Sequence, residues 1–380
     1  MPGCNVTYLK SILLLPLLFS CSSKGEFKKT VFAMDTSISC AAEAEKEEDL
    51  SEVLSPFEYY DSLADANFHH YGTIDVYDIN QASEPLEVNK DLYDLLRFAL
   101  EMEKETEGYF NPLCYGLSSL WKGALHPALA GESAFLPSQE DIDSELEKMR
   151  NTELLLEEKE GVYTAFLSKI NPEKGRASLD LGGIAKGYAA EIAKQKAKEK
   201  NWEHYYINGG SSTLVFGSST KSGGYYSVEW KEDLPGKRLL IKDACLSTSS
   251  VTVQGVEISG KIYSHIVNPF NGEASPSFTG VTLKGEDAGK LDAYSTALMW
   301  VEPSERERLE KKWGVQGIYY KDGQVLEDRL LIEAASGGLF GRNIWGTPSS
   351  SPFSPFWPCR LPSTPLCLGA GLPLTKPRSP

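Results

Sequence analysis

Apolar residues recur along this chain with two periods, one typical of helices and the other typical of strands. Spacings of three and four residues predict helices over residues 43–64, 91–107, 138–150, 184–200, 291–301 and 304–313. Short apolar runs between glycine, proline and polar residues predict strands over residues 31–41, 162–167, 178–181, 204–208, 225–230, 238–241, 262–267, 278–283, 317–320 and 324–327. Residues 109–127 contain many aromatic residues and predict a loop. Because helices and strands are mixed without strict alternation, the pattern favours an α+β fold.

The first residues have the form of a targeting segment. Lys10 precedes an apolar run over residues 12–19, which is too short to span a bilayer stably, so we expect a signal peptide over residues 1–20. The four residues that end at Cys21 resemble a bacterial lipobox, in which the cysteine is lipidated. We therefore expect a lipid anchor at Cys21 and a tether over residues 22–29. The folded domain would then be held in the bacterial cell envelope, facing the periplasm.

Composition changes sharply at the other end of the chain. Residues 337–380 contain nine prolines and no acidic residue, which predicts a disordered, Pro-rich tail after a folded domain over residues 30–332. The net charge of −15 argues against nucleic acid and anionic membrane surfaces as partners, so the lipid is the one expected membrane contact. Cys40, Cys114 and Cys245 lack metal-ligand spacing, and we expect them to be buried, inert thiols.

A double glycine before a helical pattern is a candidate anion site. The strand predicted over residues 178–181 runs into Gly182 and Gly183, and a helix follows at once. Glycine lets the backbone approach a ligand, and the first N–H groups of a helix lie at the positive end of its dipole. This arrangement suits a phosphate. Lys186 in the first helical turn is expected to face an anion, although an ordinary amphipathic helix after a glycine turn explains the same residues.

Two further groups of residues could carry chemistry. Asp292 and Thr296 are four residues apart on a predicted helix, so both oxygens project from one face and suit a hard cation such as Mg²⁺. His265 precedes a predicted turn, and histidine is the side chain that best suits proton transfer near neutral pH. Residues 247–250 predict a hydroxyl-rich turn. The alternatives are an ordinary helix end, a structural histidine and a simple loop.

Seven segments, in this order along the chain, resemble the ApbE family of FAD:protein FMN transferases. They are residues 34–36, 106–112, 180–188, 208–210, 247–249, 263–269 and 292–296. The resemblance covers about residues 30–332 and implies a single ApbE-like catalytic domain that mixes sheet and helix. It also implies a lipoprotein-type member, similar to treponemal flavin-trafficking proteins.

The same resemblance implies roles for individual residues. Mg²⁺, with Ca²⁺ and Mn²⁺ as alternatives, would be held by Ala185, Asp292 and Thr296. The implied catalytic residues are Lys186 and His265, the histidine as the acceptor of a proton. FAD is the implied substrate. Its implied contacts are Met34, Thr36, Tyr109, Asp180, Gly183, Lys186, Asn208, Gly209, Ser247, Thr248, Ser249, His265 and Ile266.

The implied reaction leaves three functions open. In the first, a Thr or Ser hydroxyl of an exported acceptor, such as a subunit of an ion-pumping or electron-transfer complex, attacks the FMN phosphorus of FAD and AMP leaves. In the second, water takes the place of the acceptor, and the protein is an FAD pyrophosphatase that yields FMN and AMP. The third is a non-catalytic lipoprotein that binds FAD. It is motivated by departures from the family pattern at Asp35, Asn111, Ser211, Ser212, Ser250 and Asn268.

Overall fold

The computed structural model describes residues 24–330, except residues 130, 132, 211, 231–236, 253–254 and 322. The expected signal peptide, the lipidation site at Cys21 and the tail over residues 337–380 lie outside the described residues. The tether expected over residues 22–29 is partly a strand. Residues 25–29 belong to the first strand, and their side chains alternate in exposure. None of the described helices is long and apolar enough to cross a membrane.

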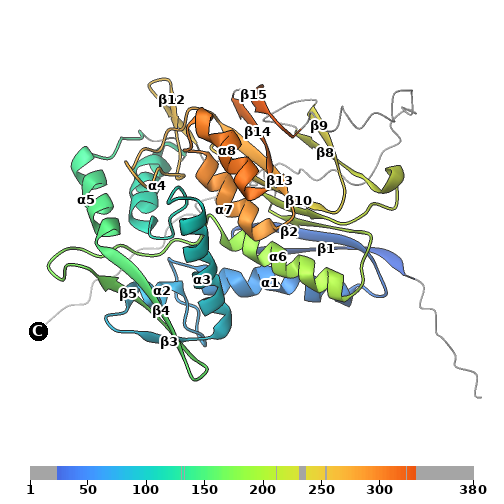
Figure 1. Ribbon diagram of the computed structural model, residues 1–380, viewed down its shortest axis with the longest axis horizontal. Helices are drawn as coiled ribbons and strands as arrows, with labels where there is room; N and C mark the ends of the chain where they lie inside the picture. Colours follow the sequence, from blue (N-terminus) through green and yellow to red (C-terminus); the bar gives the residue numbers. More distant parts are fainter. Residues whose placement is uncertain are drawn as a thin grey trace, which may run out of the picture. The chain divides into compact units, whose positions relative to one another are not determined.

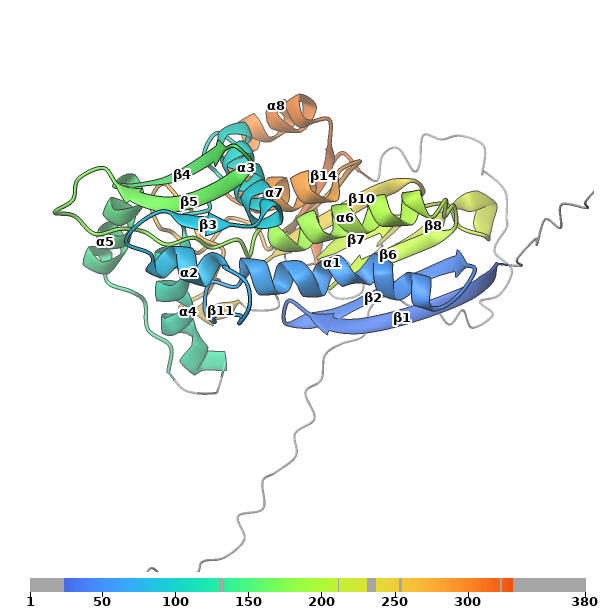
Figure 2. The same ribbon diagram turned by 90° about the horizontal axis from the view of Figure 1, so that it is seen from below.

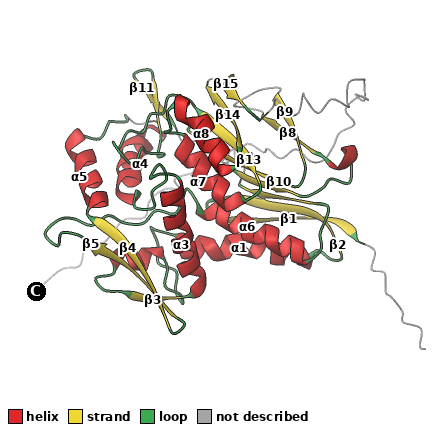
Figure 3. Ribbon diagram, viewed as in Figure 1, coloured by secondary structure: helices red, strands yellow, loops and turns green. Residues whose placement is uncertain are grey.

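An eight-stranded antiparallel sheet runs through the described chain (Figures 1 and 3). In spatial order its strands are β1 (Gly25–Ala33), β2 (Thr36–Ala44), β6 (Tyr205–Gly209), β7 (Thr213–Phe216), β10 (Ala244–Ser250), β13 (Gly280–Gly285), β14 (Gln316–Lys321) and β15 (Gln324–Asp328). Side chains alternate between the two faces of such a sheet, so the apolar side chains of each face must pack against other elements.

Helices cover one face of this sheet and a hairpin covers the other. Three helices lie side by side on the first face (Figure 2), namely α1 (Glu48–Ala64), α6 (Ala185–Glu199) and α7 (Ala288–Leu298). The hairpin of β8 (Tyr226–Trp230) and β9 (Lys237–Ile241) closes a separate apolar cluster on the second face. Along β7, Val215 belongs to the helix-side core, whereas Leu214 and Phe216 belong to the hairpin side.

The remaining elements include a small three-stranded sheet and several helices. Its strands, in spatial order, are β3 (Leu86–Val88), β5 (Val162–Lys169) and β4 (Thr152–Lys159). The helices are α2 (Val76–Gln81), α3 (Lys90–Glu105), α4 (Tyr115–Leu129), α5 (Gln139–Arg150) and α8 (Pro303–Trp313), with a 3₁₀ turn at Ser222–Gly224. The last hairpin joins β11 (Val256–Ile258) and β12 (Lys261–Tyr263). The predicted α+β fold is confirmed.

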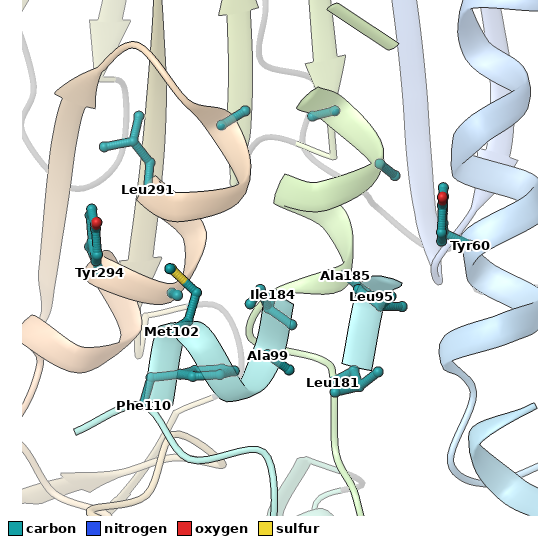
Figure 4. Packing of buried hydrophobic residues seen from close by; sticks show 14 of the residues in the cluster. Tyr60, Leu95, Ala99, Met102, Phe110, Leu181, Ile184, Ala185, Leu291 and Tyr294 are labelled. Carbon is teal, nitrogen blue, oxygen red and sulfur yellow. The ribbon is translucent and has the colours of Figure 1, made fainter. Parts of the chain in front are cut away.

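A continuous apolar core joins α3 to the start of α6 and the middle of α7. Figure 4 shows Ala99 and Met102 of α3 in the same cluster as Ile184 and Tyr294. Each of these side chains is buried. Because protein cores are close-packed, this contact fixes α6 and α7 relative to each other. The two helices carry several of the candidate site residues.

Most predicted elements are present, but the strand predicted over residues 31–41 is a hairpin. β1 ends at Ala33 and β2 begins at Thr36, so the helix predicted from residue 43 begins only at Glu48. Met34 and Asp35 turn the chain with φ angles of 52° and 57°. Two successive left-handed residues form a tight hairpin turn, which asparagine and glycine usually mark. Met34 gives no such signal.

The loop predicted over residues 109–127 is largely the helix α4. Its buried residues Leu117, Trp121, Ala124 and Leu125 follow the helical period. Glycine and serine residues and Pro127 lower the helical propensity of the segment. For this reason its helical apolar period was not recognised among the aromatic residues.

Two strand predictions and one turn prediction fail because strand pairing is not local. Residues 178–181 belong to no described strand, and the Asn80 side chain instead bonds both backbone groups of Leu179, at 2.7 and 3.1 Å. The strand predicted over residues 262–267 ends at Tyr263. The turn predicted over residues 247–250 lies inside β10, which pairs with β7 and β13.

Candidate active site

A cavity of about 550 Å³ brings most of the candidate residues together. This volume lies in the range of small-molecule sites, about 300–1,000 Å³. One wall, called here the metal wall, consists of the start of α6, α7 and the end of β10. The histidine wall consists of α4 and residues 265–267, which follow β12. Residues 64–68 and the turn between β1 and β2 also line the cavity.

The loop after α1 is held in place by contacts between histidine and aspartate side chains. His70 Nε2 lies 3.0 Å from Asp65 Oδ2, and His69 Nδ1 lies 3.1 Å from Asp78 Oδ1. Asp75 caps α2 by accepting a hydrogen bond from the backbone of Asp78. These contacts fix the loop that carries residues 64–68 against the cavity.

Asp292 is the centre of a hydrogen-bond network in the metal wall. Its Oδ2 accepts a hydrogen bond from the Gly187 N–H at 2.8 Å. Its Oδ1 accepts hydrogen bonds from Ser247 Oγ at 3.1 Å and Thr213 Oγ1 at 3.4 Å. One turn further along α7, Thr296 Oγ1 donates to the Asp292 carbonyl oxygen at 3.1 Å. Both residues line the cavity from α7, as their spacing predicts.

The donor set of the metal wall fits a hard divalent cation. Burial raises the pKa of Asp292, and the charge of Lys186 and the Gly187 N–H oppose that rise. Within the described ranges, no lysine, arginine or histidine nitrogen lies within 4 Å of this carboxylate. A buried carboxylate without an ion-pair partner favours a bound cation. Asp292, the Thr296 hydroxyl and the Ala185 carbonyl are oxygen ligands of the kind that Mg²⁺, Ca²⁺ and Mn²⁺ prefer.

Gly187 allows α6 to approach α7 closely at this point. A Cβ atom at Gly187 would lie 2.4 Å from Asp292 Cβ and 2.5 Å from the Ala288 carbonyl oxygen. The N–H groups at the helix start are therefore not all available to a phosphate. The Ala185 N–H donates to the Leu181 carbonyl, and the Gly187 N–H is used by the Asp292 carboxylate. An internal carboxylate thus occupies part of the expected anion site.

His265 lies in the segment after β12, in the histidine wall of the cavity. The segment is shaped by Ser264, whose Oγ accepts a hydrogen bond from the Ile266 N–H at 3.1 Å. His265 Nδ1 is buried and has no hydrogen-bond partner in the described part of the chain. Burial lowers the pKa of His265 to about 4, and the charges of Lys122 and Lys186 act in the same direction. The imidazole is therefore neutral at pH 7 and able to accept a proton.

Asp180 lines the cavity, but protein donors already occupy its carboxylate. Oδ1 accepts a hydrogen bond from the Gly182 N–H at 2.8 Å, and Oδ2 accepts one from Ser118 Oγ at 2.7 Å. Asp180 therefore shapes the turn before α6 and joins that turn to α4. Its predicted contact with FAD stays a prediction.

Comparison with known proteins identifies the family of this chain. The profile of the ApbE family matches residues 34–319. The chain belongs to the ApbE family. Two of its ApbE relatives bear the name FAD:protein FMN transferase. That of Chlamydia pneumoniae is 25% identical over 82% of this chain and 96% of its own, and that of Klebsiella pneumoniae is 27% identical over 59% and 67%.

Solved ApbE structures share the fold. The ApbE protein of Thermotoga maritima superposes with a TM-score of 0.67, at 22% identity over 82% of this chain and 99% of its own. The flavinyl transferase ApbE of Pseudomonas stutzeri, in its apo form, gives a TM-score of 0.63, at 19% identity over 80% and 93%. The expected ApbE-like domain is thus confirmed as a fold.

The cavity brings together twelve of the residues that the sequence singles out. They are Met34, Tyr109, Asp180, Gly183, Ala185, Lys186, Thr248, Ser249, His265, Ile266, Asp292 and Thr296. Thr36, Asn208, Gly209 and Ser247 do not line it. Thr36 packs against Gly210, and residues 208 and 209 pair with β2. Ser247 acts one layer behind the wall, through its bond to Asp292.

Sequence reasoning missed several residues of the site. The contacts of Gly187 and Thr213 with Asp292 gave no signal, although Gly187 lies in the segment 180–188, because these contacts join distant parts of the chain. Ser118 and Lys122 line the cavity from α4, and the apolar period of that helix could have placed them on one face.

Proposed function

We propose that this ApbE chain is a Mg²⁺-dependent FAD:protein FMN transferase. It moves FMN from FAD to a Thr or Ser hydroxyl of an exported redox protein and releases AMP. One observation carries the proposal, namely that a buried carboxylate and hydroxyl pair on α7 shares a cavity with the neutral His265. A phosphoryl transfer needs charge neutralisation on the phosphates and a base at the attacking oxygen.

The residues of the metal wall would hold the pyrophosphate of FAD. Asp292, Thr296 and Ala185 are the proposed ligands of Mg²⁺, which when bound neutralises phosphate charge as a Lewis acid. Lys186 lines the same wall and adds a positive charge. In a protein with a net charge of −15, such local positive charge is needed to attract a dianionic ligand.

His265 would take the proton of the attacking hydroxyl. The oxygen of the acceptor hydroxyl forms a bond to the phosphorus of the FMN half of FAD. The bond from this phosphorus to the bridging oxygen breaks, and AMP leaves with the bonding electron pair. The hydroxyl proton passes to the imidazole, which is neutral at pH 7 because burial lowers its pKa to about 4. Water in place of the acceptor gives hydrolysis with the same residues.

Two of the substituted residues, Asn111 and Asn268, give the non-catalytic alternative little support. Asn111 accepts a hydrogen bond from the Leu113 N–H at 2.8 Å and donates one to Glu103 at 2.9 Å. Asn268 accepts a hydrogen bond from the Phe270 N–H at 2.9 Å. Both amides therefore stabilise local turns, a role that does not require a carboxylate. Asp292, Thr296 and His265, which would carry the chemistry, are present.

The test is to incubate the chain from Ser22 to Pro380 with FAD, with and without Mg²⁺, and to separate AMP and FMN by chromatography. An acceptor peptide of the form Asp-Gly-x-x-Thr is added to half of the samples. Mg²⁺-dependent AMP together with flavin on the peptide supports the transferase. AMP with free FMN alone identifies a pyrophosphatase, and FAD that stays intact and bound contradicts both reactions.

The location of the enzyme is also part of the proposal. We propose that Cys21 carries a lipid and that the domain faces the periplasm, where exported acceptors such as subunits of ion-pumping or electron-transfer complexes are found. The apolar run before Cys21 supports this. Labelled palmitate should be incorporated into the wild type and not into the Cys21→Ala variant. Equal labelling of the two would contradict the anchor.

A further inference from the structure

One face of α4 presents three polar residues to the cavity, namely Tyr115, Ser118 and Lys122. Tyr115 donates from Oη to Asn67 at 3.0 Å, and Ser118 donates to Asp180 at 2.7 Å. Lys122 differs from these two. Its side chain is exposed, and among the residues that the structure describes no carboxylate lies within 4 Å of its ammonium group. Its charge is therefore available to a ligand.

Trp121, the neighbour of Lys122, anchors α4 to the segment that carries His265, and Lys122 and His265 line the same cavity. The Trp121 Nε1–H donates to the Gly272 carbonyl at 2.9 Å, and its ring stacks on Tyr263 at 5.4 Å between centroids. Tyr263 and Gly272 flank the segment that carries His265. Lys122 and His265 also interact electrostatically, because the charge of Lys122 lowers the pKa of His265.

The geometry of attack and departure at the phosphorus gives Lys122 and Lys186 different roles. Lys186 lines the metal wall from the first turn of α6, and its charge acts on both Asp292 and His265. In a phosphoryl transfer the attacking and leaving oxygens are roughly in line with the phosphorus. The leaving AMP therefore departs from the side away from the base. Lys122, which is next to the base and exposed, lies on the side from which the acceptor enters.

We propose that Lys122 recognises an acidic side chain of the acceptor polypeptide close to the hydroxyl that is modified. The inference rests on the proposed transferase function and names a feature of its protein substrate. Three further carboxylates line the cavity, namely Asp35, Asp61 and Asp65, and they disfavour an acidic segment elsewhere. Lys122 on α4, set apart from Lys186 of the metal wall, thus favours an acidic residue of the acceptor at the histidine wall, which gives specificity through both attraction and repulsion.

The test measures binding rather than turnover. A fluorescent peptide with an aspartate close to its threonine is titrated with the chain in the presence of FAD and without Mg²⁺. We expect Lys122→Ala to weaken binding about fivefold and Lys122→Glu about tenfold or more. Lys159→Ala is the matched control, since this exposed lysine lies on β4, does not line the cavity and removes one charge of the same sign. It should leave binding unchanged.

Exchange of charge between the partners makes the test specific. A peptide with asparagine in place of the aspartate should bind the wild type as weakly as the aspartate peptide binds Lys122→Ala. A peptide with lysine there should bind Lys122→Glu better than the aspartate peptide does. Equal binding of the aspartate and asparagine peptides to the wild type would overturn the inference, as would the absence of any binding.

Turnover assays then separate this inference from the proposed function. If Lys122→Ala raises the KM for FAD as much as it weakens peptide binding, the lysine belongs to the FAD site and the inference is wrong. If the wild type releases AMP in the presence of Mg²⁺ but the peptides bind equally, the chemistry stands and the recognition by Lys122 fails. If the charge exchange is seen and no AMP is formed, the proposed reaction fails and the recognition stands.

Discussion

The Gly187 N–H donates a 2.8 Å hydrogen bond to Asp292 Oδ2, which joins the first turn of α6 to the centre of α7. Helix N–H groups at this position attract anions, and here the anion is a carboxylate of the protein itself. The contact orients one oxygen of Asp292 and leaves the carboxylate in the cavity wall. The start of α6, which resembles an anion site, therefore binds and orients Asp292, a proposed ligand of a cation.

Gly187→Ala should disturb this contact. The added methyl group would lie 2.4 Å from Asp292 Cβ, so α6 and α7 must separate. We expect the free energy of unfolding in urea to fall by about 1–3 kcal/mol and Mg²⁺ affinity, measured by calorimetry, to fall with it. Gly123→Ala is the control, because a Cβ on this residue of α4 has no atom within 4 Å. It should raise stability by about 0.5–1 kcal/mol. A Gly187→Ala variant as stable as the wild type would show that α6 and α7 can move apart without loss of stability.

Asp292→Asn should separate function from stability. The substitution keeps the shape of the side chain and removes a charge that burial disfavours, as the raised pKa of Asp292 indicates. Without Mg²⁺, we expect the variant to be as stable as the wild type or more stable by about 1 kcal/mol. Its release of AMP from FAD should fall about 100-fold or more, because a proposed metal ligand is lost. Undiminished AMP release in chromatographic assays would remove Asp292 from the proposed site.

Asn80→Ala should destabilise the segment before α6. The Asn80 amide bonds both the N–H and the carbonyl of Leu179, and all three groups are buried. Unpaired buried backbone groups cost free energy, so we expect a loss of about 2–3 kcal/mol in urea unfolding. The neighbouring Gln81 is exposed, and Gln81→Ala serves as the control. Equal stability of the two variants would mean that water replaces the amide.

The parts of the site that could be predicted depend on local patterns. Asp292 and Thr296 share a face of α7 because helical spacing is a property of a few consecutive residues. The position of residues 247–250 in β10 could not be predicted in this way, because it depends on pairing with β7 and β13. The same holds for Leu179, whose partner Asn80 is far away in sequence. α4 was hidden for a different reason, namely its low intrinsic propensity.

The stability of the protein should depend on pH through His265. Burial lowers its pKa to about 4 in the folded chain, whereas the unfolded chain has the ordinary value of about 6.5. Between these values the unfolded chain binds the additional proton, so stability decreases as the pH falls through this range. From about pH 7 to about pH 4, urea unfolding should show a loss up to about 3 kcal/mol larger for the wild type than for His265→Gln. Equal losses would mean that the folded imidazole is not held neutral, which contradicts its role as the proton acceptor.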